Sequence, residues 1–224
     1  MKREIKTTKD GSKTLYINDL NESYHSQHGA IQEAKHVFIK NGLNQVNKYE
    51  INILELGLGT GLNVLVTIDD IMKNNKNQVI HYFGIEKYPI AKSEMEALDY
   101  PKLFENEKLK KIYTQIHQTE WGKSIEIHPN FFLHKIKGDF YEMDTFNLPP
   151  IDLVYFDCFG ARVQPDLWEK ALFEKVNHKM ANESLLTTYS AKGSVRRILQ
   201  DLGFEVEKKQ GPPGKREMIN AWKK

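Results

Sequence analysis

The chain has 224 residues, of which 40% are hydrophobic and 28% charged, which suits one soluble globular domain with additions. No apolar run approaches the roughly 18 residues of a membrane helix, and the first residues lack a signal core. The formal net charge is only +2, and the single cysteine, Cys158, excludes an internal disulfide and a cysteine-based metal site, so we expect a cytoplasmic protein without metal or membrane attachment.

The first part of the chain predicts an addition in front of the main domain. Residues 14–17 read as a short strand, and a polar loop leads to an amphipathic helix over residues 30–40. The pair Asn41-Gly42 closes that helix. We therefore predict an N-terminal extension or lid at residues 1–48, packed on a main domain at residues 49–224.

Strands and helices alternate from residue 51 onward. The predicted strands are 51–56, 79–85, 131–136, 151–156 and 184–189, and the predicted helices are 62–72, 91–98, 166–176 and 194–202. Residues 100–130 read as an inserted helix and hairpin, and residues 203–207 and 217–222 as a closing strand pair. This order predicts a Rossmann-like, doubly wound α/β fold whose mainly parallel sheet ends in an antiparallel hairpin.

The turn at residues 57–61 follows the first strand of this sheet and opens a helix. At such a strand-to-helix turn, where the order of strands in the sheet reverses, a ligand can approach the backbone N–H groups at the start of the helix. A dinucleotide fingerprint would have glycine at position 62, where Leu62 stands, which argues against NAD or FAD. The pattern E-x-G-x-G-x-G instead resembles motif I of class I methyltransferases, which bind S-adenosylmethionine. The resemblance implies these cofactor-binding residues: Glu55, Gly57, Gly59, Gly61 and Asn63.

Two further acids follow strands of the predicted sheet. Glu86 ends the next strand, where a carboxylate can accept hydrogen bonds from both ribose hydroxyls. Asp139 follows the third strand, where the methyltransferases place an acid beside the adenine amino group, and Phe140 can pack on that ring. Each acid taken alone is better explained as a helix cap or a loop carboxylate. Acids at three successive strand ends, together with the glycine turn, favour the methyltransferase.

Asp157 ends the fourth strand and is the candidate catalytic residue. Methyl transfer depends mainly on aligning a lone pair behind the methyl group, and a carboxylate here can hold the N–H groups of an acceptor amine. The alternative is a structural role in holding the loop. Adenine methyltransferases have two prolines after this position, and their absence weakens an adenine acceptor. No partner spacing supports Cys158 as a nucleophile, so we expect it to pack.

Positive charge is concentrated at the C-terminal end of the chain. Residues 192–224 hold nine Lys or Arg against four Asp or Glu, a local charge of +5, which leaves −3 for the remainder. This distribution suggests a polyanionic partner, and a solvated lysine-rich surface explains it equally well.

Longer motifs resemble the MnmC/MnmD-type methyltransferases, which act on the wobble uridine of tRNA. The resemblance covers nearly the full length, and its motifs lie at residues 22–26, 36–39, 57–63, 156–159, 164–168, 188–197 and 211–218. It implies methyl transfer from S-adenosylmethionine to the exocyclic amine of 5-aminomethyl-(2-thio)uridine, which gives 5-methylaminomethyl-(2-thio)uridine. Bifunctional members of the family continue into a flavin-dependent oxidoreductase domain. Because this sequence ends at Lys224, we expect that it binds no FAD and that another enzyme supplies the aminomethyl substrate.

The same resemblance assigns roles outside the cofactor turn. Tyr24 is expected to lie over the cofactor in a lid, with ordinary packing as the alternative. The anticodon loop of tRNA is the expected partner, with its wobble base splayed into the pocket. The cations expected to hold its phosphates are Lys192, Arg196, Arg197, Lys215 and Arg216.

Two rival functions remain open. One is a small-molecule N-methyltransferase or an aminopropyltransferase of related fold. The other is a non-catalytic tRNA-binding or cofactor-binding protein, against which the intact Asp157 beside a complete glycine turn argues.

Overall fold

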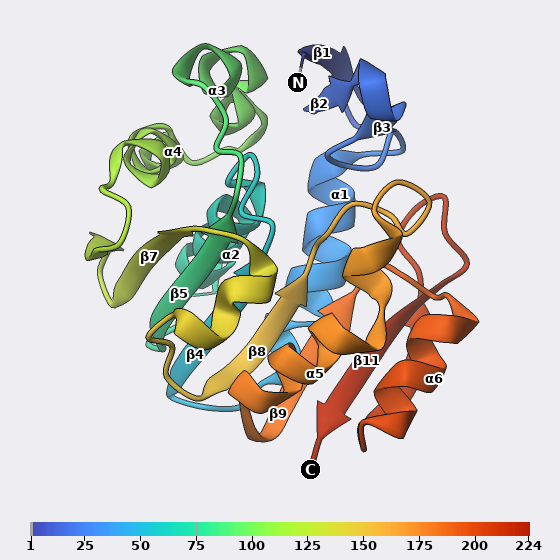
Figure 1. The fold of residues 1–224 in the computed structure, drawn as a ribbon. Helices are drawn as coiled ribbons and strands as arrows, with labels where there is room; N and C mark the ends of the chain where they lie inside the picture. The colour runs from blue at the N-terminus through green and yellow to red at the C-terminus, as the bar shows by residue number, and fades with distance from the viewer. Residues whose placement is uncertain (1, 75) are drawn as a thin grey trace.

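The computed structural model describes residues 2–74 and 76–224, which form a main sheet of eight strands and a smaller sheet of three (Figure 1). The strand order in the main sheet is β10-β11-β9-β8-β4-β5-β7-β6. Its strands are β4 (Glu50–Leu56), β5 (Val79–Glu86), β6 (Ser124–His128), β7 (Phe131–Lys137), β8 (Ile151–Phe156), β9 (Met180–Thr188), β10 (Glu205–Gln210) and β11 (Glu217–Lys223).

The sheet confirms the predicted fold class. Strands β7, β5, β4, β8 and β9 are parallel neighbours, and β11 runs antiparallel between β9 and β10. The sequence predicted a hairpin whose second strand, at residues 131–136, joins the main sheet, and β7 does so beside β5. The first strand, β6, also pairs with β7 in antiparallel register and extends the edge.

Each face of the main sheet carries its own apolar cluster. Side chains alternate between the two faces of a strand. In β4, Ile51 and Ile53 therefore join one cluster, and Leu54 and Leu56 the other. The first face is covered by α1 (Ala30–Ala34) with its π-helical continuation η2 (Lys35–Lys40), α2 (Leu62–Lys73) and α4 (Lys108–Gln118); the second by α5 (Lys170–Lys179) and α6 (Gly193–Asp201) (Figure 1).

The N-terminal segment forms the three-stranded sheet of β1 (Arg3–Thr7), β2 (Lys13–Ile17) and β3 (Glu22–Ser23). The sequence predicted only β2. This sheet docks on α3 (Lys92–Leu98), where an Arg3 guanidinium nitrogen lies 2.9 Å from a Glu94 carboxylate oxygen and Lys13 Nζ donates to the Ala97 carbonyl at 2.6 Å. It lies next to α3 at one end of the molecule (Figure 1).

The predicted helix over residues 166–176 begins later than expected. Pro165 starts a short 3-10 turn, η6 (Pro165–Trp168), and Glu169 is extended before α5 begins at Lys170. The inserted segment contains a 3-10 turn, η4 (Tyr100–Leu103), followed by α4. Among residues 2–74 and 76–224, no helix is long and apolar enough to cross a membrane.

Candidate active site

A cavity opens at the carboxyl ends of the central strands. It lies where β4 leads to α2 on one face of the sheet and β8 leads toward α5 on the other, the expected position for a ligand in a doubly wound sheet. The sequence-predicted residues that line it are Tyr24, Gly57, Gly59, Asn63, Glu86, Asp139, Phe140 and Asp157. Glu55, Gly61 and the five predicted phosphate-binding cations lie outside its lining.

The glycine turn has a backbone that side chains rarely tolerate. Gly57 has φ of +96° and Gly59 has φ of +48°. A Cβ atom on Gly57 would lie 2.9 Å from the carbonyl oxygen of Asp157, and one on Gly59 would lie 3.3 Å from a ring carbon of Tyr24. The β8 loop and the N-terminal segment therefore close directly onto this turn.

Glu55 lies beneath the cavity, which differs from the direct cofactor contact that the sequence predicts. It shares the face of β4 on which Ile53 lies, so α2 buries it completely. Its carboxyl accepts hydrogen bonds from the Tyr82 hydroxyl at 2.8 Å and from Asn63 Nδ2 at 2.7 Å. Burial raises the pKa of Glu55 well above its usual range, with the Asp157 charge adding to the shift.

Asn63 connects Glu55 to Asp157. Its Nδ2 also donates to Asp157 Oδ2 at 2.8 Å. Burial, and then the negative charge of Glu33, raises the pKa of Asp157 to about 7, against the opposing effects of Asn63 and Lys215. A carboxyl that titrates near neutral pH can exchange a proton with an acceptor amine.

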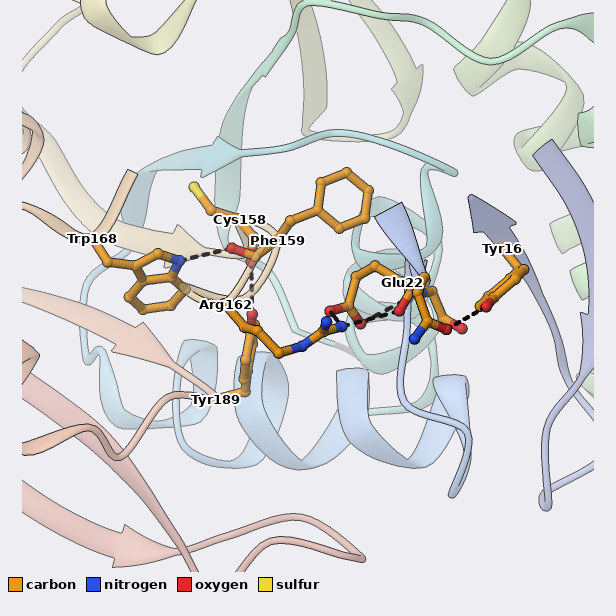
Figure 2. Close-up of polar contacts among 9 residues, drawn as sticks. Tyr16, Glu22, Cys158, Phe159, Arg162, Trp168 and Tyr189 are labelled. Atoms are coloured by element: carbon orange, nitrogen blue, oxygen red, sulfur yellow. Dashed lines mark hydrogen bonds and ion pairs between the residues drawn. The ribbon is translucent and has the colours of Figure 1, made fainter. Parts of the chain in front are cut away.

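The loop after β8 is fixed by side chains from two other segments. The Tyr189 hydroxyl donates to the Cys158 carbonyl and Trp168 Nε1 donates to the Phe159 carbonyl, both at 2.7 Å (Figure 2). Cys158 itself is buried and burial raises the pKa of its thiol well above the usual value, which agrees with a packing role. Sequence reasoning assigned no role to Tyr189 or Trp168, although both lie in the motifs of the family resemblance.

The N-terminal segment reaches across the cavity to this loop. The Tyr24 ring meets Phe159 edge-on with centroids 5.0 Å apart. Arg162 donates to the Asn21 carbonyl at 3.0 Å and to Glu22 Oε2 at 3.2 Å (Figure 2). Tyr24 thus lines the cavity where the N-terminal segment meets the loop after β8.

The other two predicted acids are already hydrogen-bonded. Glu86 Oε2 accepts from the Gly59 N–H at 2.9 Å. Asp139 accepts from the Tyr141 N–H at 2.9 Å and pairs with Lys87 Nζ at 2.7 Å, so it caps the 3-10 turn η5 (Phe140–Thr145) while lining the cavity. The Lys87 ammonium holds the pKa of Asp139 below its usual value.

One buried polar atom in the site lacks a partner. Asn63 is 2% exposed, and its Oδ1 accepts no hydrogen bond from the described residues. Because an unpaired buried acceptor is costly, this oxygen fits a donor supplied by a ligand. Within residues 2–74 and 76–224, no group of three or more His, Cys, Asp or Glu side chains is placed to hold a metal ion.

The predicted phosphate-binding cations fall into two groups. Lys192, Arg197 and Arg216 are exposed and Arg196 is half-buried, and none of the four forms an ion pair with another described residue. Lys215 differs, because its Nζ lies 2.8 Å from a Glu33 carboxylate oxygen and 3.7 Å from the centre of the Tyr189 ring.

The central parallel strands, the glycine turn and the acids at the strand ends define a class I methyltransferase. A family model described as S-adenosyl-L-methionine-dependent methyltransferase matches residues 101–224. The chain therefore belongs to this methyltransferase family.

Individual relatives are similar over nearly the whole chain. The bifunctional protein MnmC of tRNA 5-methylaminomethyl-2-thiouridine biosynthesis is 29% identical in Leptospira interrogans and in Pseudoalteromonas atlantica, over 92% and 96% of this chain. The chain spans about a third of the length of these relatives, 33% in each case. The crystal structure of MNMC2 from Aquifex aeolicus has a TM-score of 0.82 and 25% identity, covering 100% of this chain and 70% of that one.

The cavity fits S-adenosylmethionine, the cofactor of this family. The residues that would hold it are Asn63, whose unpaired Oδ1 would accept from its amino group, Glu86, which would accept from the ribose hydroxyls, and Phe140, which would pack on the adenine ring. When bound, this cofactor supplies a methyl group activated by a positively charged sulfur.

Glu86→Ala is expected to weaken S-adenosylmethionine binding by about 1–3 kcal/mol, because buried ribose hydroxyls would lose their acceptors. Calorimetric titration measures the effect. Glu105→Ala, which removes an exposed glutamate outside the cavity, is the matched control and should bind normally. Unchanged affinity in the Glu86 variant would remove this residue from the cofactor site.

Proposed function

We propose that this chain transfers a methyl group from S-adenosylmethionine to the exocyclic amine of 5-aminomethyl-(2-thio)uridine at the wobble position of tRNA. The observation that carries the proposal is the Asp157 carboxyl, which lines the cofactor cavity with Asn63 bound to it at 2.8 Å and whose pKa is raised by burial to about 7. Similarity to the MnmC proteins, whose name gives 5-methylaminomethyl-2-thiouridine as their product, supports this acceptor.

The chemistry suits a primary amine. Such an amine is mostly protonated near neutral pH, so it must lose a proton before its lone pair can attack. Asp157 can hold the N–H groups of the amine, take that proton and direct the lone pair toward the methyl group of the cofactor. Tyr24 and Phe159 form an edge-on aromatic pair on the wall of the same cavity.

The decisive experiment is transfer of labelled methyl from S-adenosylmethionine to bulk tRNA that carries 5-aminomethyluridine. We expect labelled 5-methylaminomethyl nucleosides after digestion, and no label in tRNA that lacks the aminomethyl group. Polyamines offered under the same conditions test the small-molecule alternatives. Label in polyamines alone would contradict the proposal, and binding of tRNA without transfer would indicate a non-catalytic protein.

Replacing both Arg196 and Arg197 with alanine is expected to weaken tRNA binding and to make it less sensitive to salt. Each phosphate contact in a loop or single strand contributes about −0.7 to the slope of log affinity against log salt. The slope should therefore flatten by about one to one and a half units in the double variant. Binding titrations at several salt concentrations measure it, while S-adenosylmethionine affinity stays normal.

The control removes the same charge elsewhere. Lys110 and Lys111 are adjacent exposed cations on α4, and neither forms an ion pair within the described residues. Lys110→Ala/Lys111→Ala should leave the slope close to that of the wild type. An unchanged slope in the arginine variant, with its circular dichroism intact, would exclude this pair from tRNA docking.

A further inference from the structure

A second cavity adjoins Asp157 on the side of the N-terminal sheet. It shares Tyr24, His25, Asp157, Cys158 and Phe159 with the cofactor cavity. Its remaining lining comes from the N-terminal segment, Gly160, Tyr189 and Lys215. Asp157 therefore lies on the wall between the two cavities, which makes the second one the approach for an acceptor.

An ion pair between Glu33 and the partly exposed Lys215 lines this second cavity. Glu33, from α1, is 9% exposed, and its two oxygens accept from Lys215 Nζ at 2.8 Å and from the Ser26 N–H at 2.9 Å. The Lys215 ammonium also lies over the Tyr189 ring. With donors on both oxygens, the Glu33 carboxylate has a fixed position on the wall of the cavity that Asp157 also lines.

Contacts between the two ends of the chain hold this pair in place. The turn at residues 211–214 packs so closely on the N-terminal segment that a Cβ atom on Gly214 would clash with the His28 ring. His36 Nε2 lies 2.7 Å from the Gln210 carbonyl oxygen. The loop that carries Lys215 is thus attached to the helix that carries Glu33. These contacts fix the position of Lys215.

We propose that Glu33 and Lys215 are a positioning pair whose two fixed charges set the protonation state of the Asp157 carboxyl that the acceptor meets. The inference rests on the proposed function, in which the acceptor amine reaches Asp157. In this step an N–H bond of the incoming ammonium breaks, its proton passes to an Asp157 oxygen, and the lone pair stays on nitrogen. That nitrogen then bonds to the methyl carbon while the carbon–sulfur bond breaks and its electron pair remains on sulfur.

The two members of the pair act on Asp157 in opposite directions. The negative charge of Glu33 raises the pKa of Asp157, and the positive charge of Lys215 lowers it. Asn63, from α2, also lowers it through its hydrogen bond. The other titratable groups around Asp157 are Glu55, Glu86, Tyr24, His25, Cys158 and Tyr189.

Carbon-13 NMR of aspartate carboxyls tests the pair without any substrate, with the Asp157 signal assigned from its absence in Asp157→Asn. We expect Lys215→Met to move the Asp157 titration midpoint up by about one pH unit and Glu33→Gln to move it down by a similar amount. The double variant should return close to the wild type, and Lys215→Arg should keep the wild-type midpoint. Midpoints that do not move in either single variant would overturn the proposal.

Single-turnover methylation of an anticodon stem-loop that carries 5-aminomethyluridine gives the second readout. Its pH profile should shift in the same directions as the NMR midpoints. If the wild type methylates no tRNA while the midpoints shift as expected, the proposed function fails and the charge coupling stands. If the wild type is active and the variants lose activity without any shift in profile, the pair is merely structural and the proposal is wrong. Circular dichroism of each variant verifies the fold.

Discussion

Asp157→Asn is expected to lower the single-turnover rate of methyl transfer by about 100-fold to 10,000-fold, the usual contribution of a positioned proton acceptor. The amide oxygen can still accept the hydrogen bond from Asn63, so the loop keeps its shape. Affinity for S-adenosylmethionine should therefore change little. Rapid-quench kinetics and calorimetry measure the two effects, and a rate within threefold of the wild type would make Asp157 a structural residue only.

The same substitution is expected to stabilise the fold at neutral and alkaline pH. Because the folded-state pKa of Asp157 is raised to about 7 from an ordinary value of 3.8, the folded protein retains a proton that the unfolded chain has lost. The charged Asp157 therefore lowers the free energy of unfolding increasingly between pH 4 and 7, by about 1–4 kcal/mol in all. Denaturant titrations should show Asp157→Asn more stable than the wild type at pH 8 and equally stable below about pH 4.

Gly57→Ala is expected to lower the free energy of unfolding by about 2–5 kcal/mol and to abolish methyl transfer in the protein that still folds. Two costs combine at this position. A φ of +96° is unfavourable for alanine, and the added Cβ atom would lie 2.9 Å from the Asp157 carbonyl oxygen. To relieve that contact the β8 loop must move, which displaces the carboxyl that faces both cavities.

A second glycine separates these two costs. Gly203 has φ of +89°, and a Cβ atom there would meet nothing within 4 Å. Gly203→Ala should therefore show only the backbone cost of about 1–2 kcal/mol, with normal activity. If both variants were equally destabilised and equally active, the close approach of Gly57 to the β8 loop would have no role.

The sequence alone determined the fold class and most of the cofactor cavity. Alternating strands and helices fix a parallel sheet, and residues that follow successive strands must then meet at one edge. This is why Gly57, Glu86, Asp139 and Asp157 could be assigned to a single site from their positions in the chain, and the structure brings them into one cavity.

Only the tertiary structure decided which partner each of these groups has. Glu55 points under α2 because of the face it occupies on β4, and it contacts Asp157 through Asn63 rather than facing the cavity. Lys215 reads as one more cation of a basic segment, yet it pairs with Glu33, 182 residues earlier in the chain. Periodicity and spacing report which face a residue occupies along its own element. Contacts between distant elements depend on how those elements pack, and packing sets the burial and the neighbouring charges that determine the pKa of Asp157.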